Sequence, residues 1–189
     1  NAIQKVALPE IKKGTNILTI TWPFSKRINL EWCYLLGDFG VRVCGRKKWI
    51  VPAAKELAFS DVVSQGLPFY GGNITYHIDF EGEGDFTLTS SAYHGALLNV
   101  SLDGKPTGRI VFSPYQLTLK NVKPGRHRLD ITLFGTRVNT FGQVHLILPN
   151  YTGYWFGPNA WRTKDYEWSY EYQLRSVGLL SSPTLCKNK

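Results

Sequence analysis

The sequence predicts an all-β fold, a β-sandwich or a β-barrel, on three observations. Apolar side chains alternate with polar ones at a period of two along most of the chain. Turn-forming residues separate these runs, and no run presents an apolar face of useful length at helical spacing. About a dozen short strands without helices are typical of sandwiches and barrels. Because no composition break or internal repeat divides residues 1–189, we predict a single domain.

The predicted strands follow one another along the whole chain. The clearest begins at Ile74 and ends at Phe80, where apolar side chains alternate with Thr75, His77 and Asp79. Only Ala53 to Leu57 is predicted to be helical, for about one turn. The strands are predicted at residues 16–22, 30–36, 39–44, 48–51, 74–80, 86–89, 96–102, 109–112, 116–120, 128–133, 143–148 and 170–175.

Three segments have the residues of tight turns. Asp103-Gly104 predicts a hairpin, because both residues tolerate the positive φ that such turns need. Lys123 to Arg126 reads as a turn with Pro and Gly at its centre. Glu81 to Asp85, with the sequence EGEGD, is predicted to be a flexible loop that joins two strands.

The composition excludes several classes of protein. Of 189 residues, 43% are hydrophobic, 14% aromatic and 19% charged, so a sizeable core is possible and disorder is excluded. No apolar run approaches the roughly 20 residues of a membrane span. The sequence contains no Met, from which we expect a fragment or mature form of a longer polypeptide, its localisation set by sequence outside it.

The chain is basic, with 22 Lys and Arg against 14 Asp and Glu and a formal net charge of +8. The basic residues occur in short scattered clusters without an RNA-binding aromatic motif or zinc-finger spacing, which favours a solvated basic surface over nucleic-acid binding. Three cysteines (Cys33, Cys44 and Cys186) form neither a disulfide framework nor a zinc site. Cys33 and Cys44 could face each other on neighbouring strands, but buried free thiols are the favoured interpretation.

Catalytic signals are weak. No metalloprotease, hydrolase, P-loop or dinucleotide motif is present, and the four histidines do not lie at metal-ligand spacing. Glu81, Glu83 and Asp85 could serve as the paired carboxylates of a glycosidase or bind a structural Ca²⁺. The glycines between them favour a solvated loop instead, so no catalytic residue and no cofactor is predicted.

Two stretches, 60–73 and 149–168, do not fit a strand and are rich in Gly, Pro and aromatic residues. The second has an unusual density of rings, including Trp155 and Trp161, together with Asn159 and Arg162. Sugars have an apolar CH face that stacks on such rings and a rim of hydroxyls that planar polar groups bind. The alternative is that these aromatic side chains seal the end of a sandwich.

One long segment is similar to a known family. The run Ala96 to His145 resembles the galactose-binding-like jelly-roll domains of glycoside hydrolases such as family two β-glycosidases and the rhamnosidases, and Phe69 to Tyr76 resembles the segment before their first long strand. The residues that show the resemblance are Asp103-Gly104, Thr107-Gly108, Pro114-Tyr115, Lys123-Pro124-Gly125, Leu129-Asp130-Ile131-Thr132-Leu133 and Asn139.

The resemblance implies a jelly-roll β-sandwich that is a C-terminal accessory domain of a bacterial glycoside hydrolase. The expected function is non-catalytic carbohydrate binding, with stacking on Trp155 or Trp161 supported by Tyr70, Asn139, Asn159 and Arg162. The expected partners are carbohydrate and the catalytic domain of the parent chain, without nucleic acid or membrane. Two alternatives remain, a purely structural support for a catalytic domain and a small jelly-roll glycosidase.

Overall fold

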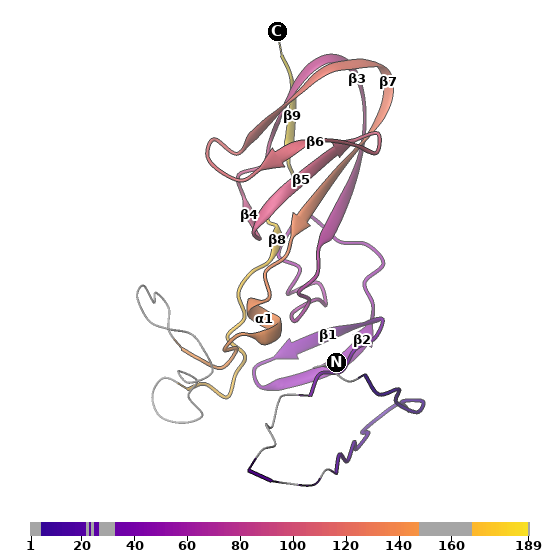
Figure 1. The fold of residues 1–189 in the computed structure, drawn as a ribbon, viewed down its shortest axis with the longest axis vertical. Helices are drawn as coiled ribbons and strands as arrows, with labels where there is room; N and C mark the ends of the chain where they lie inside the picture. The colour runs from indigo at the N-terminus through magenta and orange to yellow at the C-terminus, as the bar shows by residue number, and fades with distance from the viewer. Residues whose placement is uncertain (1–4, 22, 24, 27–32, 148–167, 189) are drawn as a thin grey trace. The chain divides into compact units, whose positions relative to one another are not determined.

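The computed structural model describes residues 5–21, 23, 25–26, 33–147 and 168–188. The chain divides into two compact units, Asn1–Leu36 and Gly37–Lys189. The described residues of the first unit form no helix or strand, so residues 16–21 are not the strand that their alternation predicts. All helices and strands described below belong to the second unit (Figure 1). A single domain over the whole chain stays a prediction.

The second unit confirms the all-β prediction. The described residues form nine strands and a single four-residue helix, which lies between β7 and β8. Every pairing is antiparallel, in a five-stranded sheet of order β6-β5-β7-β3-β9 and two-stranded sheets β1-β2 and β4-β8. The elements are β1 (Phe39–Cys44), β2 (Lys47–Pro52), β3 (Ile74–Thr89), β4 (Tyr93–His94), β5 (Leu97–Leu102), β6 (Lys105–Ile110), β7 (Gln116–Phe134), α1 (Val138–Phe141), β8 (Gly178–Leu179) and β9 (Thr184–Lys187).

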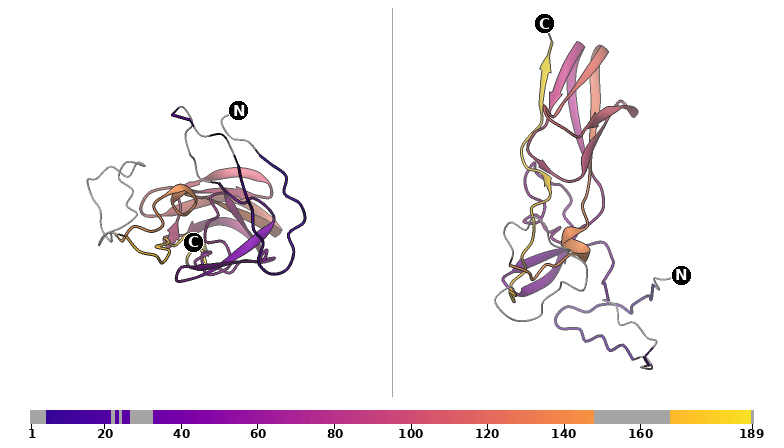
Figure 2. Two further views of the ribbon diagram at one scale, coloured as in Figure 1. Left: turned by 90° about the horizontal axis from the view of Figure 1, so that it is seen from below. Right: turned by 60° about the vertical axis from the view of Figure 1, so that its left-hand side comes forward.

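The long strands β3 and β7 pair along their whole length and build both layers of the sandwich. One half of this ribbon, from Ile74↔Leu133 to Gly82↔Gly125, is continued by β5 and β6, and the other half by β9. The ribbon bends between the halves, at two register shifts around Gly84 (Figures 1 and 2). The layers meet closely, because a Cβ on Gly108 of β6 would lie 2.6 Å from Leu117 Cδ1 of the other half.

The core lies between these layers and follows from the period of two. Even-numbered side chains of β3 point inward, whereas odd-numbered ones from Thr75 to Asp85 are exposed. On β7 the inward side chains include Leu129, Ile131 and Leu133. The most deeply buried side chains are all aliphatic or proline: Val62, Pro68, Leu88, Leu98, Val100, Ile110, Leu119, Leu129, Ile131, Leu133 and Leu179.

The structure confirms one predicted turn and corrects two. Asp103 (φ 49°) and Gly104 (φ 76°) form the tight hairpin between β5 and β6, as predicted. Glu81 to Asp85 is not a loop but the bent middle of β3, where Gly84 takes φ 94° at the bulge. Lys123 to Arg126 likewise lies inside β7. Glycines in these segments permit a bend without ending the ladder.

Other expectations at the edges of the fold are wrong. Residues 53–57 contain no helix, residues 170–175 contain no strand, and 143–147 contributes only the bridge Leu146↔Trp168. Tyr172 instead packs its ring on Phe69 and His145, so side-chain packing replaces a ladder there.

The cysteine thiols are free but exposed, not buried. Cys44 ends β1 and Cys186 lies on the edge strand β9, so neither side chain points between the layers. No helix of the described residues is long and apolar enough to cross a membrane.

Candidate functional site

The six predicted ligand-binding residues divide into two groups. Trp155, Asn159, Trp161 and Arg162 lie outside the described residues, so their roles stay predictions. Tyr70 and Asn139 lie within them, on adjoining segments, because Thr140 of α1 donates a hydrogen bond to the Phe69 carbonyl at 2.7 Å.

Asn139 serves the fold rather than an open surface. Its side chain is buried in α1, where Nδ2 donates to the Arg175 carbonyl at 2.7 Å and Oδ1 accepts from the Arg175 N–H at 2.9 Å. Tyr70 differs, because its ring is exposed and its hydroxyl donates only to the nearby Asn73 carbonyl at 3.2 Å. Of these two residues, the exposed Tyr70 remains available to a ligand.

The acidic segment of β3 does not form a metal cluster. Glu81, Glu83 and Asp85 share the exposed face of the bent strand, and Asp85 Oδ1 accepts the Asn121 N–H at 2.7 Å. The part of the chain that the structure describes contains no group of three or more potential metal-ligating side chains.

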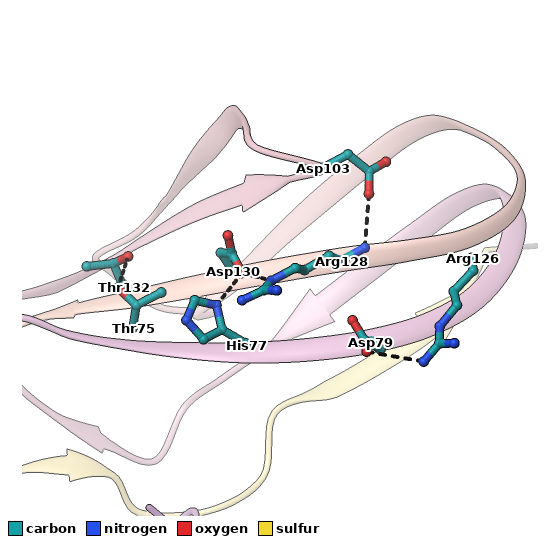
Figure 3. A network of polar contacts seen from close by, with 8 residues as sticks. All are labelled: Thr75, His77, Asp79, Asp103, Arg126, Arg128, Asp130 and Thr132. Carbon is teal, nitrogen blue, oxygen red and sulfur yellow. Dashed lines mark hydrogen bonds and ion pairs between the residues drawn. The ribbon is translucent and has the colours of Figure 1, made fainter. Parts of the chain in front are cut away.

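A row of polar side chains crosses the outer face of the β3–β7 ribbon (Figure 3). His77 Nδ1 lies 2.7 Å from Asp130 Oδ1, which also accepts Arg128 Nε at 3.1 Å. The hydrogen bond from His77 is the main cause that lowers the pKa of Asp130. A general acid needs the opposite shift, so this carboxylate is suited to holding strands together.

A second group joins the β5–β6 turn to the bend of β7. His127 Nδ1 lies 2.8 Å from Asp103 Oδ2, and its Nε2 lies 2.7 Å from the Lys123 carbonyl, so both ring nitrogens face acceptors. These contacts, with Asp103 first, raise the pKa of His127. The Arg128 N–H, followed by His127, lowers the pKa of Asp103. We call Asp103 and His127 the turn clamp.

A hollow of about 230 Å³ lies beside β4, and two aromatic side chains line it. Tyr93 and Tyr115 meet edge to face with ring centroids 6.0 Å apart. Burial raises the pKa of Tyr93, with a smaller contribution from Tyr115. The Tyr93 hydroxyl donates to the Ile110 carbonyl at 3.4 Å. The hollow is lined by Ser91, Tyr93, Gly95, Ala96, Val111 and Tyr115.

The turn beside this hollow holds an unusual backbone conformation. The Tyr115 N–H closes a turn onto the Phe112 carbonyl at 2.9 Å, and Tyr115 itself takes φ 56°. A bulky residue at positive φ is uncommon, and such outliers gather at binding sites. Phe112 of the same turn is 81% exposed. Two aromatic residues, Tyr93 and Tyr115, therefore line the hollow.

Sequence reasoning used Pro114-Tyr115 only as a marker of the fold and did not assign Tyr93 or Phe112 a role. The sequence signal for this site was weak, because Tyr93 follows a run of small residues and the turn that begins at Phe112 contains no Gly. The hollow depends on the pairing of β4 with β8, whose strands are two residues long and distant in sequence.

Comparison with known proteins gives a limited result. No family model matches the chain, and no curated protein matches it. Among solved structures, the chain is similar to a GH2 β-galacturonidase from Eisenbergiella tayi bound to glycerol, at 19% identity and a TM-score of 0.42, over 79% of this chain and 22% of that chain. The galacturonate-bound structure of GH2 β-galacturonidase from the same organism gives 20% identity and a TM-score of 0.42, over 79% and 23%.

A rhamnosidase from Novosphingobium sp. PP1Y is similar at 19% identity and a TM-score of 0.44, over 78% of this chain and 14% of that chain. The chain therefore spans less than a quarter of the length of these enzymes.

Proposed function

We propose that this chain is a non-catalytic accessory domain of a glycoside hydrolase and binds carbohydrate in the hollow beside β4. The observation that supports this most directly is the pair Tyr93 and Tyr115, which meet edge to face and line the hollow. The lining of the hollow is mainly polar, which suits the hydroxyl groups of a pyranose.

The size of the hollow favours a short ligand. At about 230 Å³ it is smaller than the roughly 300–1,000 Å³ of pockets for drug-sized molecules, so one sugar ring fits better than an oligosaccharide. The stacking roles of Trp155 and Trp161 remain a separate proposal on the sequence.

Two carboxylates of the ribbon and one in the β5–β6 turn support a non-catalytic role. Asp79, Asp103 and Asp130 each contact a neighbouring basic side chain, and Asp103 and Asp130 have lowered pKa values. A glycosidase needs one carboxyl group with a raised pKa to protonate the leaving group.

The proposal is tested by titrating the chain with a panel of neutral monosaccharides in a calorimeter. Tyr115→Ala should abolish binding of any sugar that the wild type retains, whereas Tyr170→Ala, which removes an exposed ring elsewhere, should leave it unchanged. If no sugar binds, or if binding persists in Tyr115→Ala with an unchanged unfolding midpoint, the hollow is not a sugar site. That result would favour the alternative in which the chain is a purely structural support for a catalytic domain.

A further inference from the structure

The hairpin of β1 and β2 is strongly basic and is not used by the hollow. Within Phe39–Pro52, here called the basic hairpin, the exposed cations are Arg42, Arg46, Lys47 and Lys48. Among the described residues no acidic side chain forms an ion pair with them. The acidic group seen at the hairpin is Glu171, which lies against Gly45 in the turn. The hairpin therefore presents an excess of positive charge.

The strand register places two of these cations beside an aromatic ring. Arg42 pairs with Trp49 and Cys44 pairs with Lys47, so Arg42, Lys47 and Trp49 share one face. The Arg42 guanidinium lies 4.8 Å from the centre of the Trp49 ring. Lys48 belongs to the other face, where its Nζ lies 5.3 Å from the Tyr172 ring.

The position of Arg42 over the Trp49 ring suits it to a planar anion. A guanidinium has N–H groups in one plane, and two of them can bind one carboxylate. Lys47 and Trp49 are two residues apart on one strand, roughly 6.5 Å. Trp49 keeps 40% of its surface exposed.

We propose that this face of the basic hairpin binds an acidic polysaccharide whose sugar rings bear carboxylates. Such a ring offers a carboxylate to Arg42 and its CH groups to the part of the Trp49 side chain that Arg42 leaves exposed, with Lys47 meeting the next negative charge. The inference rests on the proposed carbohydrate-binding function and adds a second, anionic site outside the hollow.

The arrangement favours a polysaccharide over a single-stranded nucleic acid. Nucleic-acid sites of that kind stack successive bases on several aromatic side chains along a groove. Among the residues of the hairpin itself, Trp49 is the single aromatic side chain on this face, since Phe39 lies on the opposite face and Tyr172 meets Lys48 there.

The test measures binding of the whole chain to alginate, with one carboxylate on each ring, to neutral dextran, and to a single-stranded DNA oligonucleotide. We expect alginate to bind at low salt and weaken as salt rises. Arg42→Lys keeps the charge but loses the stacked fork, and Lys47→Gln loses a charge. Each should weaken alginate binding about tenfold, as expected for loss of one charge-assisted contact. Lys120→Gln, an exposed cation on β7, is the charge-matched control for Lys47→Gln.

Three results would overturn this inference: no binding of alginate, an equal loss in Lys120→Gln, or DNA binding as tight as that of alginate with the same dependence on Arg42. Unfolding midpoints of the variants confirm that the hairpin is intact. The outcome is separable from that of the hollow. If the wild type does not bind alginate but binds a neutral sugar that depends on Tyr115, only the anionic site is refuted. If it binds alginate but no such neutral sugar, only the hollow is refuted as a sugar site.

Discussion

The hydrogen bond between the Leu179 N–H and the Tyr76 hydroxyl, 3.2 Å long, joins β8 to the core face of β3. Leu179 is 0% exposed and Tyr76 is 6% exposed, so water cannot replace this acceptor. Tyr76→Phe keeps the ring and its stacking on Phe59, 5.5 Å between centroids, but leaves a buried N–H unpaired. An unpaired buried donor costs about 1–3 kcal/mol, and we expect the free energy of unfolding to fall by that amount.

Urea unfolding followed by tryptophan fluorescence measures the change, which should appear in the midpoint with an unchanged slope. Tyr70→Phe is the matched control, because its exposed hydroxyl bonds a nearby carbonyl and should cost less than about 0.5 kcal/mol. Equal effects of the two substitutions would refute the reasoning. Burial raises the pKa of Tyr76, against a smaller opposing effect of the Leu179 N–H. The wild type should therefore lose stability as pH rises above about 10, and Tyr76→Phe should lose less.

Three further changes test other contacts. Asn139→Ala removes both hydrogen bonds of a buried amide and should lower the free energy of unfolding by about 1–3 kcal/mol, while sugar titrations stay unchanged. The turn clamp makes stability pH-dependent: the His127 contribution is complete below about pH 6.5 and is lost as pH rises through its raised pKa, whereas the Asp103 contribution is lost as pH falls below about 4. Thermal unfolding should show a maximum between these limits that His127→Gln flattens; an unchanged profile would refute the clamp. Gly108→Val places atoms between the layers and should cost about 1–3 kcal/mol in urea unfolding, and no loss would contradict their close approach.

The alternation of residues predicts the sheet faces well and the ends of strands poorly. The strand at Ile74 to Phe80 was predicted from its period of two, because alternation alone is enough to identify a half-buried strand. The EGEGD segment misled, since its glycines permit either a loop or a bent strand, and the distant pairing with β7 decides between them. Strands β8 and β9 are too short to show a period.

The candidate site was less predictable than the sheets, because it also depends on contacts between segments that are distant in the sequence. The family resemblance implied Asn139 as a supporting ligand contact, but the buried amide of this residue binds the backbone of Arg175. Tyr93 and Tyr115 come together only through the fold, and no local pattern records a contact between segments.

Because one ribbon supplies strands to both layers, neither layer can form a complete sheet before β3 and β7 have met. Their pairing must close the chain segment that lies between them, residues 90–115. Closing such a segment is slow compared with forming a local hairpin such as β5–β6. During synthesis the outer edge of β3 also waits for β9, which is made well after β3 and β7. A nascent chain would present that edge unpaired, which makes this strand the point most exposed to mispairing with another molecule.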